Sequence, residues 1–217
     1  MRNFNLKYKV DMTKVCIILL SLVIAALITG GVVDARQEVL LAQAQEHLAQ
    51  EVLRFHILAN SDSEEDQALK MTVKERVLDW MKVCLPEDLD VDQTRMWLRE
   101  HSDEIEEMCA EEIEAQGYDY PVSAAVTTCY FPEKTYGDVT FPAGNYEALR
   151  IEIGAAKGHN WWCVLYPNLC FLDAVHAVVP EEGKEELKQV LTEEEYELFT
   201  SDSDVRIRSF FLDRLEK

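Results

Sequence analysis

A run of apolar residues near the N-terminus dominates the hydropathy pattern of the chain. From Val15 to Val33 the sequence reads VCIILLSLVIAALITGGVV, 19 residues without a charge. A helix of this length, at about 1.5 Å per residue, nearly crosses the roughly 30 Å hydrocarbon core of a bilayer. Basic residues precede the run and Asp34 follows it. The positive-inside rule therefore places the chain after Asp34 outside the cytoplasmic membrane.

The apolar run fits two fates, a retained membrane anchor or a cleaved signal peptide. Gly30 and Gly31 end the run, and Val33-Asp34-Ala35 is a usable small-residue cleavage site. The run is longer than the core of an ordinary signal peptide, which favours retention. The two fates stay open on the sequence alone.

Behind the apolar run, the pattern divides the rest of the chain into a stalk and a body. Residues 36–52 are polar with apolar positions at helical spacing, which predicts a juxtamembrane helix or stalk. We therefore expect residues 1–35 to form the cytoplasmic flank and the export or anchor segment. Residues 53–217 should then form one extracytoplasmic domain.

The body should begin with a strand and two amphipathic helices. Leu53, Phe55 and Ile57 alternate with polar residues, the pattern of a half-buried strand. Ser63 then offers a helix N-cap, with Asp66 approximating a capping box. One helix should run from residue 64 to 84 and a second from about 92 to 116. Two such helices joined by a short loop suggest an antiparallel hairpin.

The second half of the body has the composition of strands. Its segments are rich in β-branched and aromatic residues, and Pro, Gly and Asn turns separate them. These segments are VSAAVTTCYF from Val122, VTFPAGNYEALRIEIG from Val139 and NWWCVLYPNLCFLD from Asn160. A short acidic helix is expected near Glu181–Leu191, and the final VRIRSFFLDRLEK alternates at first and then suits a helix. The sequence thus predicts an α+β fold, an N-terminal apolar helix followed by a helical hairpin packed on a small antiparallel sheet.

The charge of the chain limits its partners. Its net charge is −20, from 21 Lys and Arg against 41 Asp and Glu. Such a chain is repelled by nucleic-acid phosphates and by anionic lipid headgroups, so nucleic-acid binding is not expected and membrane contact rests on the N-terminal segment. A partner with a basic surface would be attracted. The charge is equally consistent with solubility alone.

Cys163 and Cys170 are the first candidate pair with specific chemistry. They flank VLYPNL, and in a hairpin with a two-residue loop at Tyr166-Pro167 they would face each other. A disulfide is therefore feasible in an exported protein, with two buried thiols as the alternative. Five cysteines follow the apolar run, so at least one has no intramolecular partner: Cys84, Cys109, Cys129, Cys163 and Cys170.

Metal binding and catalysis receive little support from the sequence. His159, Cys163, Cys170 and His176 have the chemistry of zinc ligands, but their spacing matches no common finger. A thiolate at Cys163 or Cys170 would need a histidine, with His56, His159 or His176 available. No hydrolase or phosphate-loop motif accompanies them. We expect no metal, no cofactor and no catalytic residues.

Two groups of residues are candidate partner contacts. His56, Asn60 and Asp62 lie where the first strand ends and a helix begins, and the alternative for them is a capped, satisfied polar turn. Large aromatic residues dominate binding hot spots, with ordinary core packing as the alternative. Trp161 and Trp162 should lie on opposite faces of one strand, so one should be core and the other available for contact. The aromatic candidates are Trp161, Trp162, Tyr166 and Phe171.

Two long segments resemble one known family. The run HILANSDSEEDQALKMTVKERVL, from His56 to Leu78, is similar to the opening of the stage II sporulation protein R family. The run FPAGNYEALRIEIGAAKGHNWWCVLYPNLCFLD, from Phe141 to Asp173, is similar to a later part of it. An apolar leader before the domain also fits, whereas the acidic second helix and the C-terminal tail are less informative.

The resemblance implies a function that composition does not show. Members of this family are made in the forespore of endospore-forming bacteria and exported into the space between its two membranes. There they trigger a membrane-embedded protease of the mother cell, which cleaves a sigma-factor precursor. The chain is thus expected to be a non-enzymatic sporulation signal with that protease as its partner. The alternatives are a cell-envelope cysteine hydrolase and an envelope-binding module.

Overall fold

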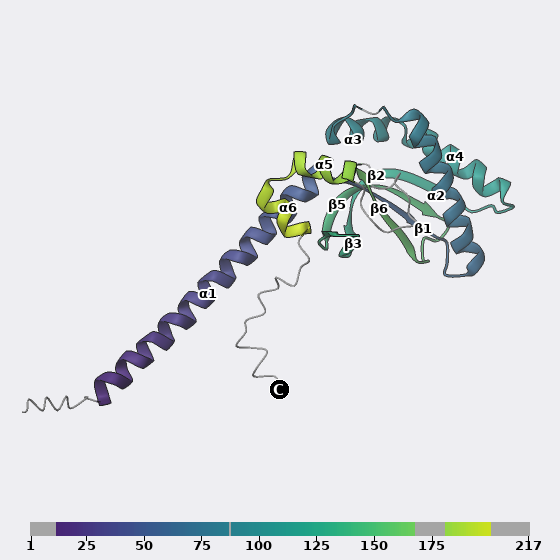
Figure 1. Cartoon of the computed structure of the whole chain (residues 1–217). Helices are drawn as coiled ribbons and strands as arrows, with labels where there is room; N and C mark the ends of the chain where they lie inside the picture. The colour runs from purple at the N-terminus through teal and green to yellow at the C-terminus, as the bar shows by residue number, and fades with distance from the viewer. Residues whose placement is uncertain (1–11, 87, 168–180, 201–217) are drawn as a thin grey trace, which may run out of the picture. The chain divides into compact units, whose positions relative to one another are not determined.

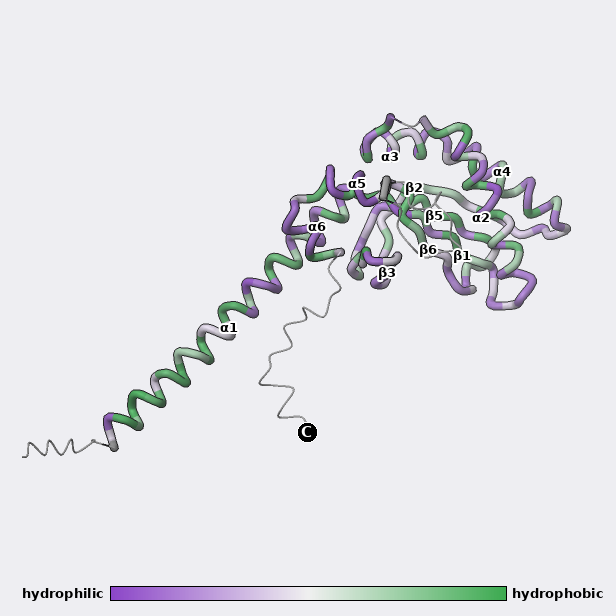
Figure 2. The backbone as a smooth tube through the Cα atoms, viewed as in Figure 1, coloured by the Kyte–Doolittle hydropathy of each residue, from purple (hydrophilic) through white to green (hydrophobic). Residues whose placement is uncertain are grey.

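The computed structural model describes residues 12–86, 88–167 and 181–200 (Figure 1). The chain divides into two compact units, residues 1–43 and 44–217. The first unit holds most of helix α1 (Met12–Glu51), which is long and apolar enough to cross a membrane. Figure 2 shows its apolar run as a mostly green stretch. The expected apolar helix is confirmed, and the stalk pattern after it continues the same helix to Glu51.

The second unit is built on a four-stranded sheet. Strand order is β2-β5-β1-β6, and a separate two-stranded sheet pairs β3 with β4. The strands are β1 (Leu53–Leu58), β2 (Val122–Phe131), β3 (Lys134–Tyr136), β4 (Val139–Phe141), β5 (Gly144–Ile153) and β6 (Asn160–Tyr166). The helices are α2 (Glu64–Cys84), α3 (Val91–Glu100), α4 (Ser102–Ala115), α5 (Glu181–Val190) and α6 (Glu193–Thr200). The predicted α+β class is confirmed.

The direction of one strand pair departs from the expectation. The β5 strand is antiparallel to β2, and β6 is antiparallel to β1, but β1 and β5 are parallel. The sheet is therefore mixed, not antiparallel. The reason is connectivity: three helices and the strands β2, β3 and β4 separate β1 from β5, and a crossover of that length can return the chain in the parallel direction. An alternation of apolar and polar residues carries no information about strand direction.

Strand β1 is buried along its whole length, where the sequence predicted a half-buried strand. Helices α2, α3 and α4 cover one face of the sheet, here called the helical face. The other face, here called the hairpin face, is covered by the last turns of α1, by β3 and β4, and by α5 and α6. Because β1 is a central strand covered on both faces, even its polar residues Arg54 and His56 are buried.

The predicted second helix is two helices. It breaks at His101, between α3 and α4, where the imidazole Nδ1 lies 2.7 Å from the Trp97 carbonyl oxygen. The same ring stacks on the Trp97 indole with the centroids 4.0 Å apart. The local contacts of His101 thus hold the chain at the break. The predicted N-cap at Ser63 is confirmed, since its hydroxyl accepts a hydrogen bond from the Asp66 N–H.

The tail follows the expectation where the structure describes it. Helix α5 begins at Glu181 as predicted and ends at Val190, and the additional helix α6 follows it. The final segment VRIRSFFLDRLEK lies outside the described residues. Helix α6 contributes Phe199 to the core of the hairpin face.

The last turns of α1 are part of the second unit. Ala44, Leu48 and Val52 are buried in the core of the hairpin face. Gln45 Nε2 donates a hydrogen bond to the Ala143 carbonyl (2.7 Å), and His47 Nδ1 lies 3.0 Å from the carboxylate of Glu195 in α6. The folded body therefore begins at Ala44.

Arg54 occupies the centre of the hairpin face. Its side chain is fully buried, and its guanidinium lies over the rings of Phe131 (4.2 Å), Tyr146 (5.0 Å) and Phe141 (5.4 Å). Nη2 donates to the Tyr136 hydroxyl at 3.2 Å. Among the described residues no carboxylate pairs with it, and Nη1 has no hydrogen-bond partner. Burial lowers the pKa of Arg54. The three rings stabilise its buried positive charge by cation–π attraction.

The aromatic residues around Arg54 provide a test of stability. Replacing the side chain, Arg54→Ala, removes the contacts with four aromatic residues from four strands and leaves a cavity. We expect the free energy of unfolding to fall by about 2–5 kcal/mol. Urea denaturation followed by tryptophan fluorescence measures the loss. The matched control is Arg76→Ala, because Arg76 is exposed on α2; equal stability of the two variants would contradict a structural role for Arg54.

Candidate partner-binding site

His56 and Trp162 form a stacked pair on the hairpin face. They are cross-strand partners in β1 and β6, and their rings stack 3.7 Å apart with an 18° tilt. Phe131 contacts the indole edge to face, with the centroids 4.6 Å apart. His56 is only 4% exposed and Trp162 is half-buried. The indole thus covers the histidine.

The surroundings of His56 keep it neutral. Burial, and next the nearby Arg150 guanidinium, lower its pKa to about 4, although the Asn160 amide acts in the opposite direction. Its Nδ1 lies 3.8 Å from Cys129 Sγ, and burial raises the pKa of that thiol. A protonated thiol beside a weakly basic imidazole is a poor nucleophile pair. This contact therefore suits structure better than catalysis.

Trp161 lies on the helical face, opposite Trp162. Its indole packs edge to face against Phe55 with the centroids 5.4 Å apart, and Lys74 Nζ lies 5.3 Å from the ring centroid. The predicted placement on opposite faces is confirmed. Neither ring is fully core, because both are half-buried, and their role as partner contacts stays a prediction. The cause of the half-burial is that each face of the sheet carries its own covering layer.

Asn60 belongs to a hydrogen-bonded joint between two loops. Its Oδ1 accepts from the Ala155 N–H (2.9 Å) and its Nδ2 donates to Asp66 Oδ2 (2.8 Å). Ser61 Oγ donates to the same carboxylate at 2.5 Å. The hydrogen bond from Ser61 is the main cause that keeps the pKa of Asp66 below its ordinary value. The contacts agree with the alternative reading of Asn60 as part of a satisfied polar turn.

The glycines of the second loop permit this joint. Gly154 has a φ of +59°, and a Cβ at this position would collide with the Asn60 side chain. A Cβ on Gly158 would collide with the Ser61 carbonyl, and the Gly158 N–H donates to the Ala59 carbonyl at 2.9 Å. The two loops therefore pack backbone against backbone.

Asp62 is the exposed member of the joint. Its Oδ1 accepts from both the backbone N–H and Nδ1 of His159, each at 2.5 Å. The side chains of Asp62 and His159 are 56% and 82% exposed. The hydrogen bonds from His159 lower the pKa of Asp62, so the carboxylate is charged. Among the described residues that were predicted as contacts, Asp62 alone has an exposed side chain.

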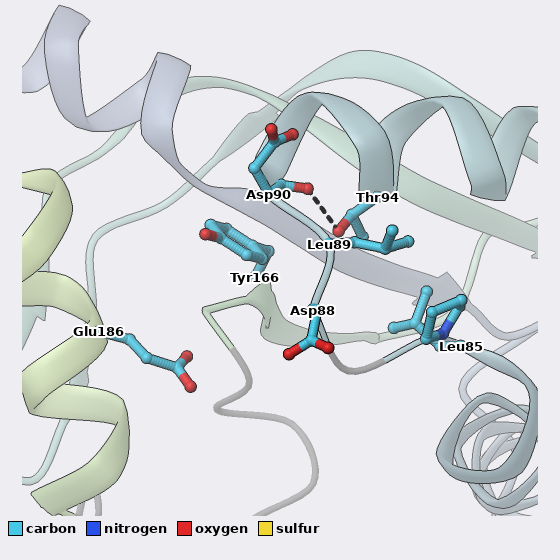
Figure 3. Close-up of a pocket in the computed structure, with 8 residues that line it drawn as sticks. Leu85, Asp88, Leu89, Asp90, Thr94, Tyr166 and Glu186 are labelled. Carbon is cyan, nitrogen blue, oxygen red and sulfur yellow. Dashed lines mark hydrogen bonds between the residues drawn. The ribbon is translucent and has the colours of Figure 1, made fainter.

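Tyr166 lines a cavity of about 290 Å³ at the end of β6. Figure 3 shows its ring between Asp90 and Glu186, with Asp88 on the same hollow. Burial is the main cause that raises the pKa of Tyr166, followed by the Glu186 and Asp90 carboxylates. The phenol is therefore neutral. A cavity with such a lining favours positively charged groups over anions.

Of the two disulfide candidates, the structure describes Cys163. Cys163 is buried and disulfide-bonded, while Cys84, Cys109 and Cys129 are free thiols. Cys170 lies outside the described residues, so its pairing with Cys163 stays a prediction. Phe171 and His176 lie outside them too. Within the described part of the chain, no three His, Cys, Asp or Glu side chains gather to hold a metal ion.

Sequence reasoning missed the polar residues that organise this end of the body. Asp66 was assigned only to a helix cap, yet its carboxylate joins the two loops. Arg150 of the adjacent strand β5 and Cys129 of β2 lie near His56, and the sequence pattern indicated neither contact. The sequence contained one signal for these contacts. Charged or reactive side chains occur at strand positions that alternate onto a buried face, where polar residues are uncommon.

The loop joint predicts a stability effect at Asp66. In the Asp66→Ala variant, the part-buried donors of Asn60 and Ser61 lose their acceptor, so we expect the free energy of unfolding to fall by about 1–3 kcal/mol. Chemical denaturation at neutral pH measures the change. The control is Asp119→Ala, which removes an exposed carboxylate; a loss no larger than the control would show that the joint contributes nothing.

The buried imidazole predicts a pH dependence. Unfolded His56 binds a proton near its ordinary pKa of 6.5, whereas the folded protein binds it only at about 4. Acid therefore favours the unfolded chain, and stability is lost as pH falls from about 6.5 toward 4, by about 3 kcal/mol in all.

A pair of variants isolates the contribution of His56 from that of other titrating groups. The His56→Phe variant keeps a ring against Trp162 and should lose less stability than wild type between pH 6.5 and 4. Denaturation curves at several pH values compare it with His159→Phe, at an exposed histidine. Parallel pH profiles for wild type and His56→Phe would refute the assignment.

Comparison with known proteins identifies relatives of the chain. The family model described as Stage II sporulation protein R matches residues 49–176. The Stage II sporulation protein R of Bacillus subtilis (strain 168) is 33% identical over 177 residues, which cover 79% of each chain. No solved structure matches the chain at a significant level. The matched region contains the whole sheet and the loop joint. The chain belongs to the Stage II sporulation protein R family.

Proposed function

We propose that this protein is an exported sporulation signal that activates a membrane-embedded protease of the mother cell, which then cleaves a sigma-factor precursor. Membership of the Stage II sporulation protein R family is the observation that carries the proposal. The proposed place of action is the space between the forespore and mother-cell membranes. The partner is the protease itself.

The N-terminal helix supports the export step. It is compatible with export or with membrane anchoring, and its flanking charges direct the body outward. The body that follows begins at Ala44, after the apolar run has ended. Either fate of the apolar run therefore delivers an intact body to the outer side.

The body acts as a ligand in this proposal and performs no chemistry. A ligand activates a receptor only if it binds the active arrangement more tightly than the inactive one. The contact residues predicted from the sequence form part of this proposal. Asp62 with His159 offers an exposed hydrogen-bonded pair for such contact, whereas His56 and Asn60 support the surface from within.

The cysteine hydrolase alternative loses its nucleophile at Cys163. A disulfide-bonded sulfur has no thiolate to attack a substrate. The contact between Cys129 and His56 has the wrong pKa values for the same role, with the thiol raised and the imidazole lowered. These observations favour binding over catalysis.

Reconstitution in a non-sporulating host tests the proposal. The host would carry the membrane protease and the sigma-factor precursor, with or without the full chain. We expect precursor cleavage only when the chain is present and exported. The control is a variant starting at Arg36, which lacks the apolar run and stays in the cytoplasm but keeps every residue from Ala44 onward that packs in the body.

The outcomes separate signalling from its alternatives. Cleavage that requires export supports the signalling role. Equal cleavage by the exported and the cytoplasmic chain would place the action on the wrong side of the membrane. No cleavage, with the body folded outside and the protease taken from the same organism, would overturn the proposal.

A further inference from the structure

Strand β2 is an edge strand without the usual protection. Among the described residues it pairs with β5 alone, through ten consecutive residue pairs from Val122 to Phe131 with no shift of register. Its sequence VSAAVTTCYF contains no charge, no proline and no glycine, in a chain that is 29% charged. Natural sheets protect long edges with lysine, proline or bulges, because an open edge recruits another strand.

The outward-facing backbone groups of β2 can be assigned. The Ala124 N–H donates a hydrogen bond to the Glu106 carboxylate of α4 at 3.0 Å, so the Ala124 amide points away from β5. Backbone direction alternates along an antiparallel strand. The amides of Val126, Thr128 and Tyr130 therefore also point away from β5. Glu106 thus accepts the outward hydrogen bond of Ala124, and the run from Val126 to Tyr130 follows Ala124 along the strand.

The side chains along this run are accessible. Thr128 and Tyr130 are exposed on the helical face, with Tyr130 62% exposed, and Ala125 is exposed on the hairpin face. A strand approaching the edge would meet small side chains and one aromatic ring. Strand addition uses such a surface, since backbone hydrogen bonds supply affinity and flanking side chains supply selectivity.

Charge distinguishes the possible occupants of this edge. Helix α4, which packs on β2, carries acidic residues in every turn and no basic residue. Helix α3 also contacts β2, and its Arg95 and Arg99 are both paired with Glu147, opposite Thr128. A second copy of the chain would bring another net charge of −20 against it. A segment with lysine or arginine is attracted instead. The edge also lies within the family match at residues 49–176, whereas the C-terminal residues 201–217 do not.

We propose that the β2 edge from Val126 to Tyr130 receives an extended, basic segment of the partner protein as an added strand. The inference rests on the proposed function, because the partner is the membrane protease that the body activates. The added strand would pair with the outward amides and carbonyls of Val126, Thr128 and Tyr130. Its basic side chains would be attracted by the acidic body, which carries most of the chain's net charge of −20.

Proline at position 128 tests the edge selectively. Thr128→Pro removes an outward N–H, so the ladder between β2 and β5 keeps its hydrogen bonds, and proline is tolerated at such edge positions. The matched control is Glu193→Pro at the exposed first residue of α6, where the N–H has no helical partner. We expect Thr128→Pro in the full exported chain to lower precursor cleavage at least about tenfold, through lost backbone hydrogen bonds and steric blocking. Glu193→Pro should cleave as wild type does.

The reconstituted system keeps this test separate from that of the proposed function. Failure of the wild-type chain to cause cleavage would count against the signalling role itself. Wild-type cleavage together with undiminished cleavage by a folded Thr128→Pro chain would overturn the edge and leave the signalling role standing. Circular dichroism and thermal melting of the full-length variants in detergent establish their folding.

Amide exchange on the unmodified chain supplies an independent measurement. With exchange resolved to single residues, the amides of Val126, Thr128 and Tyr130 should exchange rapidly in the full-length chain alone. They should become protected when the protease is added in nanodiscs, whereas the amides of Thr127 and Cys129 are protected throughout.

Other patterns of protection would identify a different occupant and overturn the proposal. Protection that grows with protein concentration in the absence of the protease would indicate a second copy. Protection in the isolated chain that disappears when residues 201–217 are removed would indicate the C-terminal segment of the same chain. Amides that stay unprotected with active protease present would show that the edge takes no strand.

Discussion

The burial of Arg54, with no carboxylate paired to it among the described residues, is the constraint around which the hairpin face is arranged. A guanidinium removed from water needs compensation, and here it comes from the rings of Phe131, Phe141 and Tyr146 and the hydroxyl of Tyr136. These residues come from β2, β3, β4 and β5, so one central cation fixes the small β3–β4 sheet against the large one. The aromatic residues that cover it also seat the last turns of α1 and the helices of the tail.

The sequence predicted most elements of the fold because hydrophobic periodicity and turn residues are local signals. The strand beginning at Val122 and the helix capped by Ser63 were found with their boundaries for this reason. The parallel pairing of β1 with β5 was missed, since strand direction depends on connectivity between distant segments. The burial of Arg54 was missed because its position alternates with apolar residues and so looks exposed. Its aromatic partners come from strands far along the chain.

The candidate site shows the same division between local and distant information. The placement of Trp161 and Trp162 on opposite faces follows from strand geometry alone. Their half-burial depends on layers supplied by α2 on one side and by Phe131 and His56 on the other. The role of Asn60 likewise depends on Gly154 and Ala155, more than ninety positions away. Motif and spacing indicated where the candidate site lies. Only the long-range contacts show which of its residues are internal and which are exposed.

The seating of Ala44, Leu48 and Val52 in the hairpin-face core links folding to transport. A chain exported from its N-terminus brings these residues across the membrane first, while their partners in α5 and α6 follow at the very end. Until Phe199 has crossed, the core of this face lacks one of its sides. In the proposed export, completion of the body therefore requires that almost the whole chain has left the cytoplasm. A translation or export event that stops early delivers no finished hairpin face to the outside.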